Sequence, residues 1–163
     1  MPARMTALLG DITTETVDAI VNAANAHLAR GGGVCGAIFA AAGPELEVAC
    51  ARIGHCATGD AVITPGFRLP AEWIVHTVGP VWHGGRDGEP DLLASCYRRS
   101  LEVAQAADVT SIAFPAISTG IFGYPARAAA EIAVTTVRAF PGDIDVRLVA
   151  FDAETLGLYE SLL

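Results

Sequence analysis

The chain has 163 residues, of which 52% are hydrophobic and 17% are charged, and its formal net charge is −8. This length suits one domain with a sizeable core, and the high apolar content excludes an intrinsically disordered chain. Ten arginines, no lysine and eighteen acidic residues disfavour binding to the backbone of nucleic acids or to an anionic membrane surface.

Short apolar runs alternate with helix-like segments along the chain. Strands are predicted at residues 5–9, 19–21, 61–64, 73–78, 111–114 and 146–151. Helices are predicted from the glycines after Arg30 to about Cys50, and at residues 92–107, 125–140 and 155–162. Apolar strands that alternate with helices indicate an α/β domain, with a largely parallel sheet covered on both faces.

Polar or glycine-rich clusters follow four of these strands. They are Gly10-Asp11, residues 22–25, residues 118–124 and Phe151-Asp152. In parallel α/β folds the ligand lies beyond the carboxyl ends of the strands. We therefore expect the four clusters to form one site at a single rim of the sheet.

Residues 30–39, RGGGVCGAIF, place three glycines directly before a predicted helix. Glycines let backbone N–H groups converge on a ligand, and the start of a helix adds free N–H groups and a positive dipole end. The segment therefore predicts an anion site made of backbone, and it lacks the Lys of a nucleotide-triphosphate P-loop. The alternative is a flexible turn between strand and helix.

Asp11 and two asparagines offer polar contacts at the same rim. The Asp11 carboxylate can accept a hydrogen bond from an exocyclic amine such as that of adenine, or it can cap a turn at Thr13. The amides of Asn22 and Asn25 suit sugar hydroxyls, or they form an ordinary Asx turn.

The 118–124 loop, STGIFGY, is a second glycine loop that leads into a helix. It can supply N–H donors opposite the first loop, so that a diphosphate is held between them without a cation. Phe122 and Tyr124 either wall a sugar pocket or pack the loop. Phe151 either stacks on a base or belongs to the core.

The remaining histidines, cysteines and aromatic residues give weaker signals. His76 lies in an apolar strand and is expected to be a core histidine, whereas Trp82-His83 is expected at the rim of a pocket. Cys50 with the nearby pair His55-Cys56 lacks a fourth ligand, so no metal site is predicted. Without a CxxC pair, a secretory signal or a long apolar run, we expect a cytoplasmic protein with reduced thiols.

Seven blocks of the sequence resemble the macrodomain family, most closely its MacroD-like hydrolase branch. In chain order they are GDIT, VDAIVNAAN, GGGVCGAI, AAGPEL, TGDAVITPGFRLP, WIVHTVGPVW and IAFPAISTGIFGYP, and they extend over about residues 8–151. The resemblance implies a three-layer α/β/α sandwich around a mixed, mostly parallel six-stranded sheet. It also implies ADP-ribose as the ligand, with no metal or cofactor.

The resemblance assigns a role to each cluster. Asp11 and Ile12 would bind the adenine, and Phe151 would stack on it. One side of the diphosphate and distal ribose would be held by Gly32, Gly33, Val34 and Cys35, and the other side by Ser118, Thr119, Gly120, Ile121 and Phe122. Asn25 would contact the distal ribose, which Phe122 and Tyr124 would flank. Catalytic roles would fall to Asn25, Gly33, Cys35 and Phe122.

Two positions depart from the branch, which usually reads GGGVDGAIH. Cys35 replaces an aspartate implicated in orienting water, and Phe39 replaces a histidine. The expected activity is hydrolysis of mono-ADP-ribose esters on acidic side chains of proteins, or of O-acetyl-ADP-ribose, by a substrate-assisted attack of water. The alternative is a reader module that binds ADP-ribose without turnover. RNA binding is a weaker possibility that the acidic charge opposes.

Overall fold

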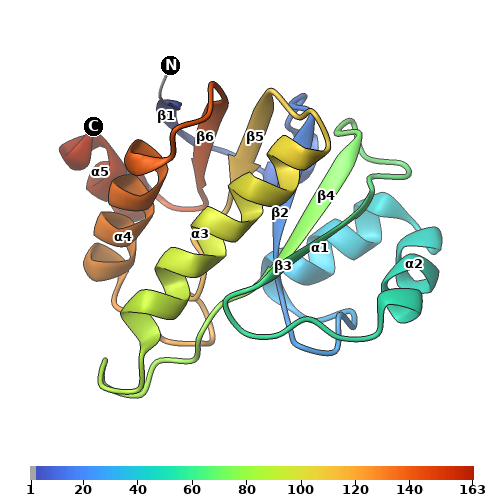
Figure 1. Ribbon diagram of the computed structural model, residues 1–163, viewed down its shortest axis with the longest axis horizontal. Helices are drawn as coiled ribbons and strands as arrows, with labels where there is room; N and C mark the ends of the chain where they lie inside the picture. Colours follow the sequence, from blue (N-terminus) through green and yellow to red (C-terminus); the bar gives the residue numbers. More distant parts are fainter. Residues whose placement is uncertain (1–2) are drawn as a thin grey trace.

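One six-stranded sheet forms the centre of the computed structural model, which describes residues 3–163 (Figure 1). Its strands are β1 (Arg4–Leu9), β2 (Ala19–Ala24), β3 (Ala61–Pro65), β4 (Trp73–Val78), β5 (Ser111–Phe114) and β6 (Asp145–Ala150). The spatial order is β1-β6-β5-β2-β4-β3, in which β3 is antiparallel to β4 and all other neighbours are parallel. The expected mixed, mostly parallel sheet is confirmed.

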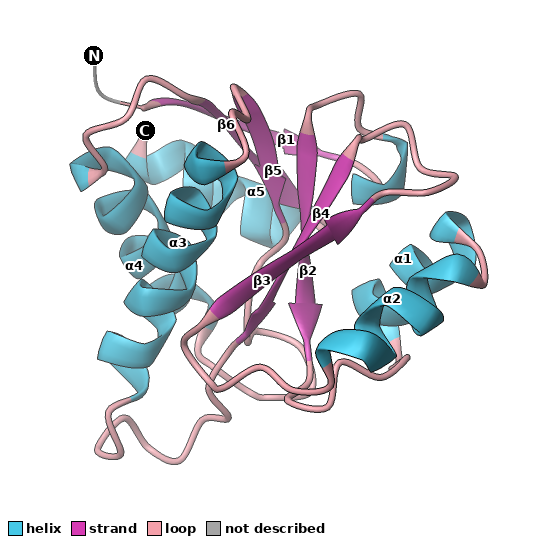
Figure 2. Cartoon of the chain, turned by 45° about the vertical axis from the view of Figure 1, so that its right-hand side comes forward, coloured by secondary structure: helices cyan, strands magenta, loops and turns pink. Residues whose placement is uncertain are grey.

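Helices cover both faces of this sheet (Figure 2). The elements are the 3-10 turn η1 (Ile12–Thr14) and the helices α1 (Gly33–Ala42), α2 (Glu45–Ile53), α3 (Glu89–Ala106), α4 (Ala126–Ala139) and α5 (Ala153–Leu162). Helices α3, α4 and α5 pack on one face, and α1 and α2 pack on the other. This is the expected three-layer α/β/α sandwich. Within residues 3–163 no single helix is long and apolar enough to cross a membrane, although α1 and α2 together, bent by 117°, reach that length and apolarity.

Two hydrophobic cores lie on opposite sides of the sheet because successive strand residues point to opposite faces. In β4, Val75 belongs to the core under α3 and α4, and its neighbour Ile74 belongs to the core under α1 and α2. In β6, Leu148 and Val149 divide in the same way. All four side chains are buried. Apolar residues on both sides of these strands therefore serve the two cores, which explains the continuous apolar runs in the sequence.

The segment after the glycines is helical, as the pattern to about Cys50 predicted, but it is not one continuous helix. The segment instead forms α1 and α2, which are separated by Gly43 and Pro44. Gly43 adopts a positive φ of 92°, and the side chain of Arg68 packs against it so closely that a Cβ atom there would lie 2.9 Å from the guanidinium Nε. Pro44 then starts α2, so the chain turns before helical hydrogen bonding resumes.

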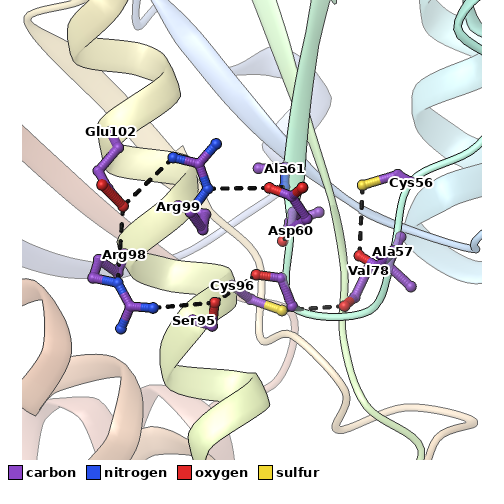
Figure 3. Close-up of polar contacts among 12 residues, drawn as sticks. Cys56, Ala57, Asp60, Ala61, Val78, Ser95, Cys96, Arg98, Arg99 and Glu102 are labelled. Atoms are coloured by element: carbon purple, nitrogen blue, oxygen red, sulfur yellow. Dashed lines mark hydrogen bonds and ion pairs between the residues drawn. The ribbon is translucent and has the colours of Figure 1, made fainter.

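Polar contacts anchor the middle of α3 at the edge of the sheet. Arg99 reaches Asp60 at 3.1 Å, and the Cys96 thiol donates to the Val78 carbonyl at 3.2 Å (Figure 3). Val78 is the last residue of β4, and Asp60 directly precedes β3. The middle of α3 is therefore fixed next to the carboxyl end of β4, where the candidate site lies.

Candidate functional site

A cavity of about 730 Å³ opens at the carboxyl ends of the parallel strands. Its lining includes residues that follow directly after five of them: Gly10 after β1, Asn25 after β2, Gly79 after β4, Pro115 after β5 and Phe151 after β6. This is the rim at which parallel α/β sheets bind ligands. The expectation that the four polar clusters meet there is confirmed.

Almost all of the residues singled out in the sequence line this cavity. They are Asp11, Ile12, Asn25, Gly32, Gly33, Val34, Cys35, Ser118, Thr119, Gly120, Ile121, Phe122 and Phe151. Gly79 and Thr155 also line the cavity, and neither residue was expected there. Gly79 directly follows a predicted strand, and this position at the carboxyl end of the strand is the signal that would have identified it.

The first wall of the cavity is the glycine loop at residues 31–33 with the first turn of α1. Gly32 is the N-cap, and Gly33 has a φ of 56°, a conformation that favours glycine. The first N–H to bond within the helix is that of Gly36, which donates to the Gly32 carbonyl at 3.2 Å. The N–H groups of Gly33, Val34 and Cys35 therefore remain available to a ligand.

The second wall is the 118–124 loop, which is closed on itself. Tyr124 donates its N–H to the Ser118 carbonyl at 2.9 Å, and Gly123 donates to the Gly120 carbonyl at 3.0 Å. Within residues 3–163, the N–H groups of residues 119–122 have no hydrogen-bond partner. The buried Ser118 hydroxyl also lacks a partner there. These unused donors border the cavity and suit an anion.

Neither wall contributes a cationic side chain, because no Arg or His is among the residues that line the cavity. Its two carboxylates, Asp11 and Asp152, come from the ends of β1 and β6. Asp11 Oδ1 accepts from the N–H of Thr13 at 2.9 Å and from its hydroxyl at 2.7 Å, so the capping alternative is present in the structure. No bond to the second oxygen, Oδ2, is found within residues 3–163, so the same side chain can also accept from a ligand amine.

Asn25 is held rigidly at the other end of the cavity. Its Nδ2 donates to the Ala29 carbonyl at 2.8 Å, and its Oδ1 accepts from the Ala29 N–H at 3.1 Å. These two bonds fix which amide atom is nitrogen and leave one N–H of Nδ2 free. Asn22 does not line the cavity, which corrects the expectation that both amides serve a sugar: its side chain is buried, and Nδ2 lies 3.8 Å from the Sγ atom of Cys35.

His76 is the expected core histidine. Its Nδ1 lies 3.0 Å from Asn22 Nδ2 and its Nε2 lies 2.9 Å from Thr64 Oγ1, so both ring nitrogens are within hydrogen-bond distance of a buried polar group. Burial lowers the pKa of His76 to about 4. The Cys50 thiol lies 4.0 Å from the same ring, and burial raises its pKa to about 11. Within residues 3–163 no three His, Cys, Asp or Glu side chains form a metal-binding group.

The aromatic residues near the cavity have different positions. Phe151 is 93% exposed at the rim, free to stack on a flat ring, and Phe122 lines the interior. Tyr124 does not line the cavity, which corrects the expectation that it flanks a sugar. Its ring is buried and packs on Trp82 with ring centroids 4.6 Å apart. Tyr124 therefore supports the loop from behind.

The family model described as Macro domain matches residues 21–133, a span that includes most of both walls. The chain belongs to the Macro domain family. A Macro domain-containing protein of Ralstonia nicotianae is 58% identical to this macrodomain over 96% of this chain and 92% of the relative. The O-acetyl-ADP-ribose deacetylase of Citrobacter rodentium is 52% identical over 100% of this chain and 97% of the relative.

Solved macrodomain structures are also similar to this chain. The Oceanobacillus iheyensis macrodomain with ADP has 44% sequence identity and a TM-score of 0.93, over 96% of this macrodomain and 88% of that chain. The Trypanosoma brucei macrodomain in complex with ADP-ribose has 38% identity and a TM-score of 0.91, over 98% of this macrodomain and 68% of that chain.

Proposed function

We propose that this macrodomain binds ADP-ribose in the cavity and hydrolyses esters at its distal ribose. The substrates are O-acetyl-ADP-ribose and proteins that carry mono-ADP-ribose on acidic side chains. One observation carries the proposal: two facing walls of unused backbone N–H groups border a cavity that has no cationic side chain in its lining. The relatives named O-acetyl-ADP-ribose deacetylase, which are 52–54% identical over nearly their whole length, support the reaction.

The two ends of the cavity give the ligand its direction. Asp11 offers an acceptor for the adenine amine, and exposed Phe151 offers a face for the ring. At the opposite end Asn25 offers a fixed amide for the hydroxyls of the distal ribose, and the proposal places the lining residues Cys35 and Phe122 beside that ribose. The diphosphate then lies between the walls, where its charge meets the amino end of α1.

Hydrolysis in this cavity depends on positioning. Among the lining residues, the end near Asn25 has no carboxylate and no histidine to act as a base. Water held by loop N–H groups and by the ligand's own phosphate attacks the ester carbon, and a phosphate oxygen accepts its proton. The bond from the acyl carbon to the ribose oxygen breaks, and the ribose oxygen takes up the proton from the phosphate. The products are ADP-ribose and either acetate or the free side-chain carboxylate. Holding the reactants in place can supply several kcal/mol of the barrier reduction.

Cys35 is disfavoured as a nucleophile by its surroundings. Its Sγ atom lies 3.8 Å from Asn22 Nδ2 and 3.8 Å from the Ala29 carbonyl, and neither group can accept a proton as a general base. The nearest histidine in this network, His76, is separated from Cys35 by Asn22. The thiol therefore serves as part of the wall.

A turnover assay tests this function. Purified protein is incubated with O-acetyl-ADP-ribose and with a glutamate-linked mono-ADP-ribosylated protein, and release of ADP-ribose is measured. We expect release above the uncatalysed rate, and we expect Asn25→Ala to reduce it by about a hundredfold because the ribose is no longer oriented.

The second candidate is a reader that binds ADP-ribose without turnover, and the presence of Cys35 where the similar hydrolases usually carry aspartate favours it. Tight binding of ADP-ribose with no release from either ester would establish the reader and overturn the hydrolase.

A further inference from the structure

Glu89 is a buried acidic residue that the proposed reaction does not use. It is the first residue of α3 and is 1% exposed. Its carboxylate accepts three backbone N–H groups from the preceding loop: those of His83 at 2.8 Å, Gly85 at 2.9 Å and Asp87 at 2.6 Å. Burial alone would raise the pKa of Glu89, but these donors lower it to about 2. The ionised carboxylate therefore fixes the loop at residues 79–88.

This 79–88 loop touches the second wall of the cavity through Trp82. The Trp82 N–H donates to the Phe122 carbonyl at 2.9 Å. The Trp82 ring packs on Tyr124, and Gly85 lies against the outer edge of the Trp82 indole, where a Cβ atom would approach Cη2 to 2.8 Å. Burial raises the pKa of Tyr124, and the nearby Glu89 charge raises it further. Glu89, the 79–88 loop and the 118–124 loop thus form one continuous set of contacts.

The hydrogen bond from Trp82 fixes the part of the 118–124 loop that carries Phe122. The loop's own bonds join Ser118 to Tyr124 and Gly120 to Gly123, and they leave the Phe122 peptide without a partner inside the loop. Trp82 is its hydrogen-bond partner from outside. A shift of the 79–88 loop would therefore move Phe122, while the glycine loop at residues 31–33 would stay in place.

We propose that Glu89 is a positioning residue for this macrodomain: it braces the 79–88 loop so that Trp82 holds Phe122 against the distal ribose. The inference rests on the proposed function, in which Phe122 borders that ribose. It predicts selectivity between two ligands. ADP-ribose carries the distal ribose and ADP does not, so loss of Glu89 should weaken the first ligand and spare the second.

The test compares Glu89→Gln with wild-type protein by calorimetric titration of both ligands. Glutamine keeps the shape but replaces one acceptor oxygen by an NH₂ group that faces the loop N–H donors. We expect affinity for ADP-ribose to fall about tenfold, affinity for ADP to change less than about twofold, and kcat for O-acetyl-ADP-ribose to fall more than KM rises. The control is Asp91→Asn, which removes an exposed charge from the same first turn of α3 and should leave all three values unchanged.

Two glycine variants provide an independent test in case Glu89→Gln does not fold. Gly85→Ala drives a Cβ atom into the Trp82 ring and should give the same selective loss. Gly84→Ala is the matched control, because its φ of 92° is as strained as the 86° of Gly85 but its Cβ atom would meet no neighbour within 4 Å.

A double-mutant cycle that combines Glu89→Gln with Phe122→Ala tests whether Glu89 acts through Phe122. If Glu89 acts through Phe122, the two losses of ADP-ribose affinity are less than additive. Equal losses for ADP and ADP-ribose, no loss, or full additivity would overturn the inference. A wild-type protein that binds neither ligand would instead overturn the proposed function itself.

Discussion

Gly79 and Ser118 pack so tightly that a Cβ atom on residue 79 would overlap the Ser118 hydroxyl oxygen and lie 2.7 Å from Ile117 Cγ2. Gly79 directly follows β4, and Ser118 opens the second wall of the cavity with a φ of 67°. A non-glycine residue in that conformation is strained and stays there only when its surroundings require it. The absent side chain at residue 79 therefore sets how far Ser118 can withdraw from the ligand.

Gly79→Ala should push Ser118 toward the cavity and lower affinity for ADP-ribose at least tenfold, or by about 1.4 kcal/mol. The free energy of unfolding should also fall by about 1–3 kcal/mol, as in an overpacked core. Calorimetric titration and urea denaturation measure the two effects. Gly157→Ala is the control: its Cβ atom would meet no neighbour within 4 Å in α5, so stability should rise slightly and affinity should not change. An affinity equal to that of the wild type in Gly79→Ala would refute the steric argument.

Cys35 variants separate a thiol nucleophile from a passive wall. Cys35→Ala should retain most of the turnover of O-acetyl-ADP-ribose, because the hydrogen-bond partners of Sγ provide no base. Loss of all release, or trapping of a covalent adduct in the wild type, would instead establish covalent catalysis.

Cys35→Asp restores the carboxylate that the family usually carries at this position. If a missing water-orienting group limits the reaction, kcat should rise by about tenfold or more, within the range that a positioned base contributes. An unchanged or lower kcat, with ADP-ribose affinity retained, would show that the phosphate of the substrate already fulfils this role.

Asp11→Asn tests the adenine end. The asparagine Oδ1 can keep the cap on Thr13, while the NH₂ group replaces the acceptor offered to the adenine amine. Affinity for ADP-ribose should therefore fall. Affinity for the analogue with hypoxanthine in place of adenine, which presents an acceptor where adenine presents its amine, should rise relative to the affinity for ADP-ribose. Parallel titrations of the two nucleotides measure the ratio. A ratio that does not change would remove Asp11 from base recognition and leave it as a cap only.

The buried ring of His76 makes stability depend on pH. Its pKa is about 4 in the folded chain and 6.5 when exposed, so the unfolded chain binds more protons between these values. The stabilisation that comes from keeping this ring neutral is fully present above pH 6.5. As the pH falls toward 4, the free energy of unfolding decreases by about 3 kcal/mol in total. Urea midpoints between pH 7 and 4.5 should show this slope. His76→Gln should flatten it, and the exposed His55→Gln should not.

Local sequence signals predicted most of the fold. The strand predicted at residues 73–78 agrees with β4, and the one at 111–114 agrees with β5, because continuous apolar runs between turn residues leave few alternatives. The boundary between α1 and α2 was missed although Gly43 and Pro44 are local signals that end a helix, because apolar residues on both sides of them continue the helical pattern. The first residues of α3 were missed because Glu89 lies in a stretch without apolar periodicity. Its carboxylate instead accepts N–H groups from the preceding loop.

The candidate site was predictable at the level of clusters and less so at single side chains. Strand ends in a parallel sheet share one rim, so Asp11, Asn25 and Phe151 could be assigned to the same cavity. Asn22 was misplaced because strand alternation turns its side chain away from the cavity. Tyr124 was misplaced because its ring stacks on Trp82. Neither effect is visible in the chemistry of the residue itself.

Calorimetric titration of ADP-ribose into the wild-type protein tests the central claim most directly, when repeated from low to high salt. Binding by backbone N–H groups in a cavity whose lining has no cationic side chain predicts one site per chain, with an affinity that changes little with salt. Absence of binding heat, or an affinity that falls steeply as salt rises, would contradict the account.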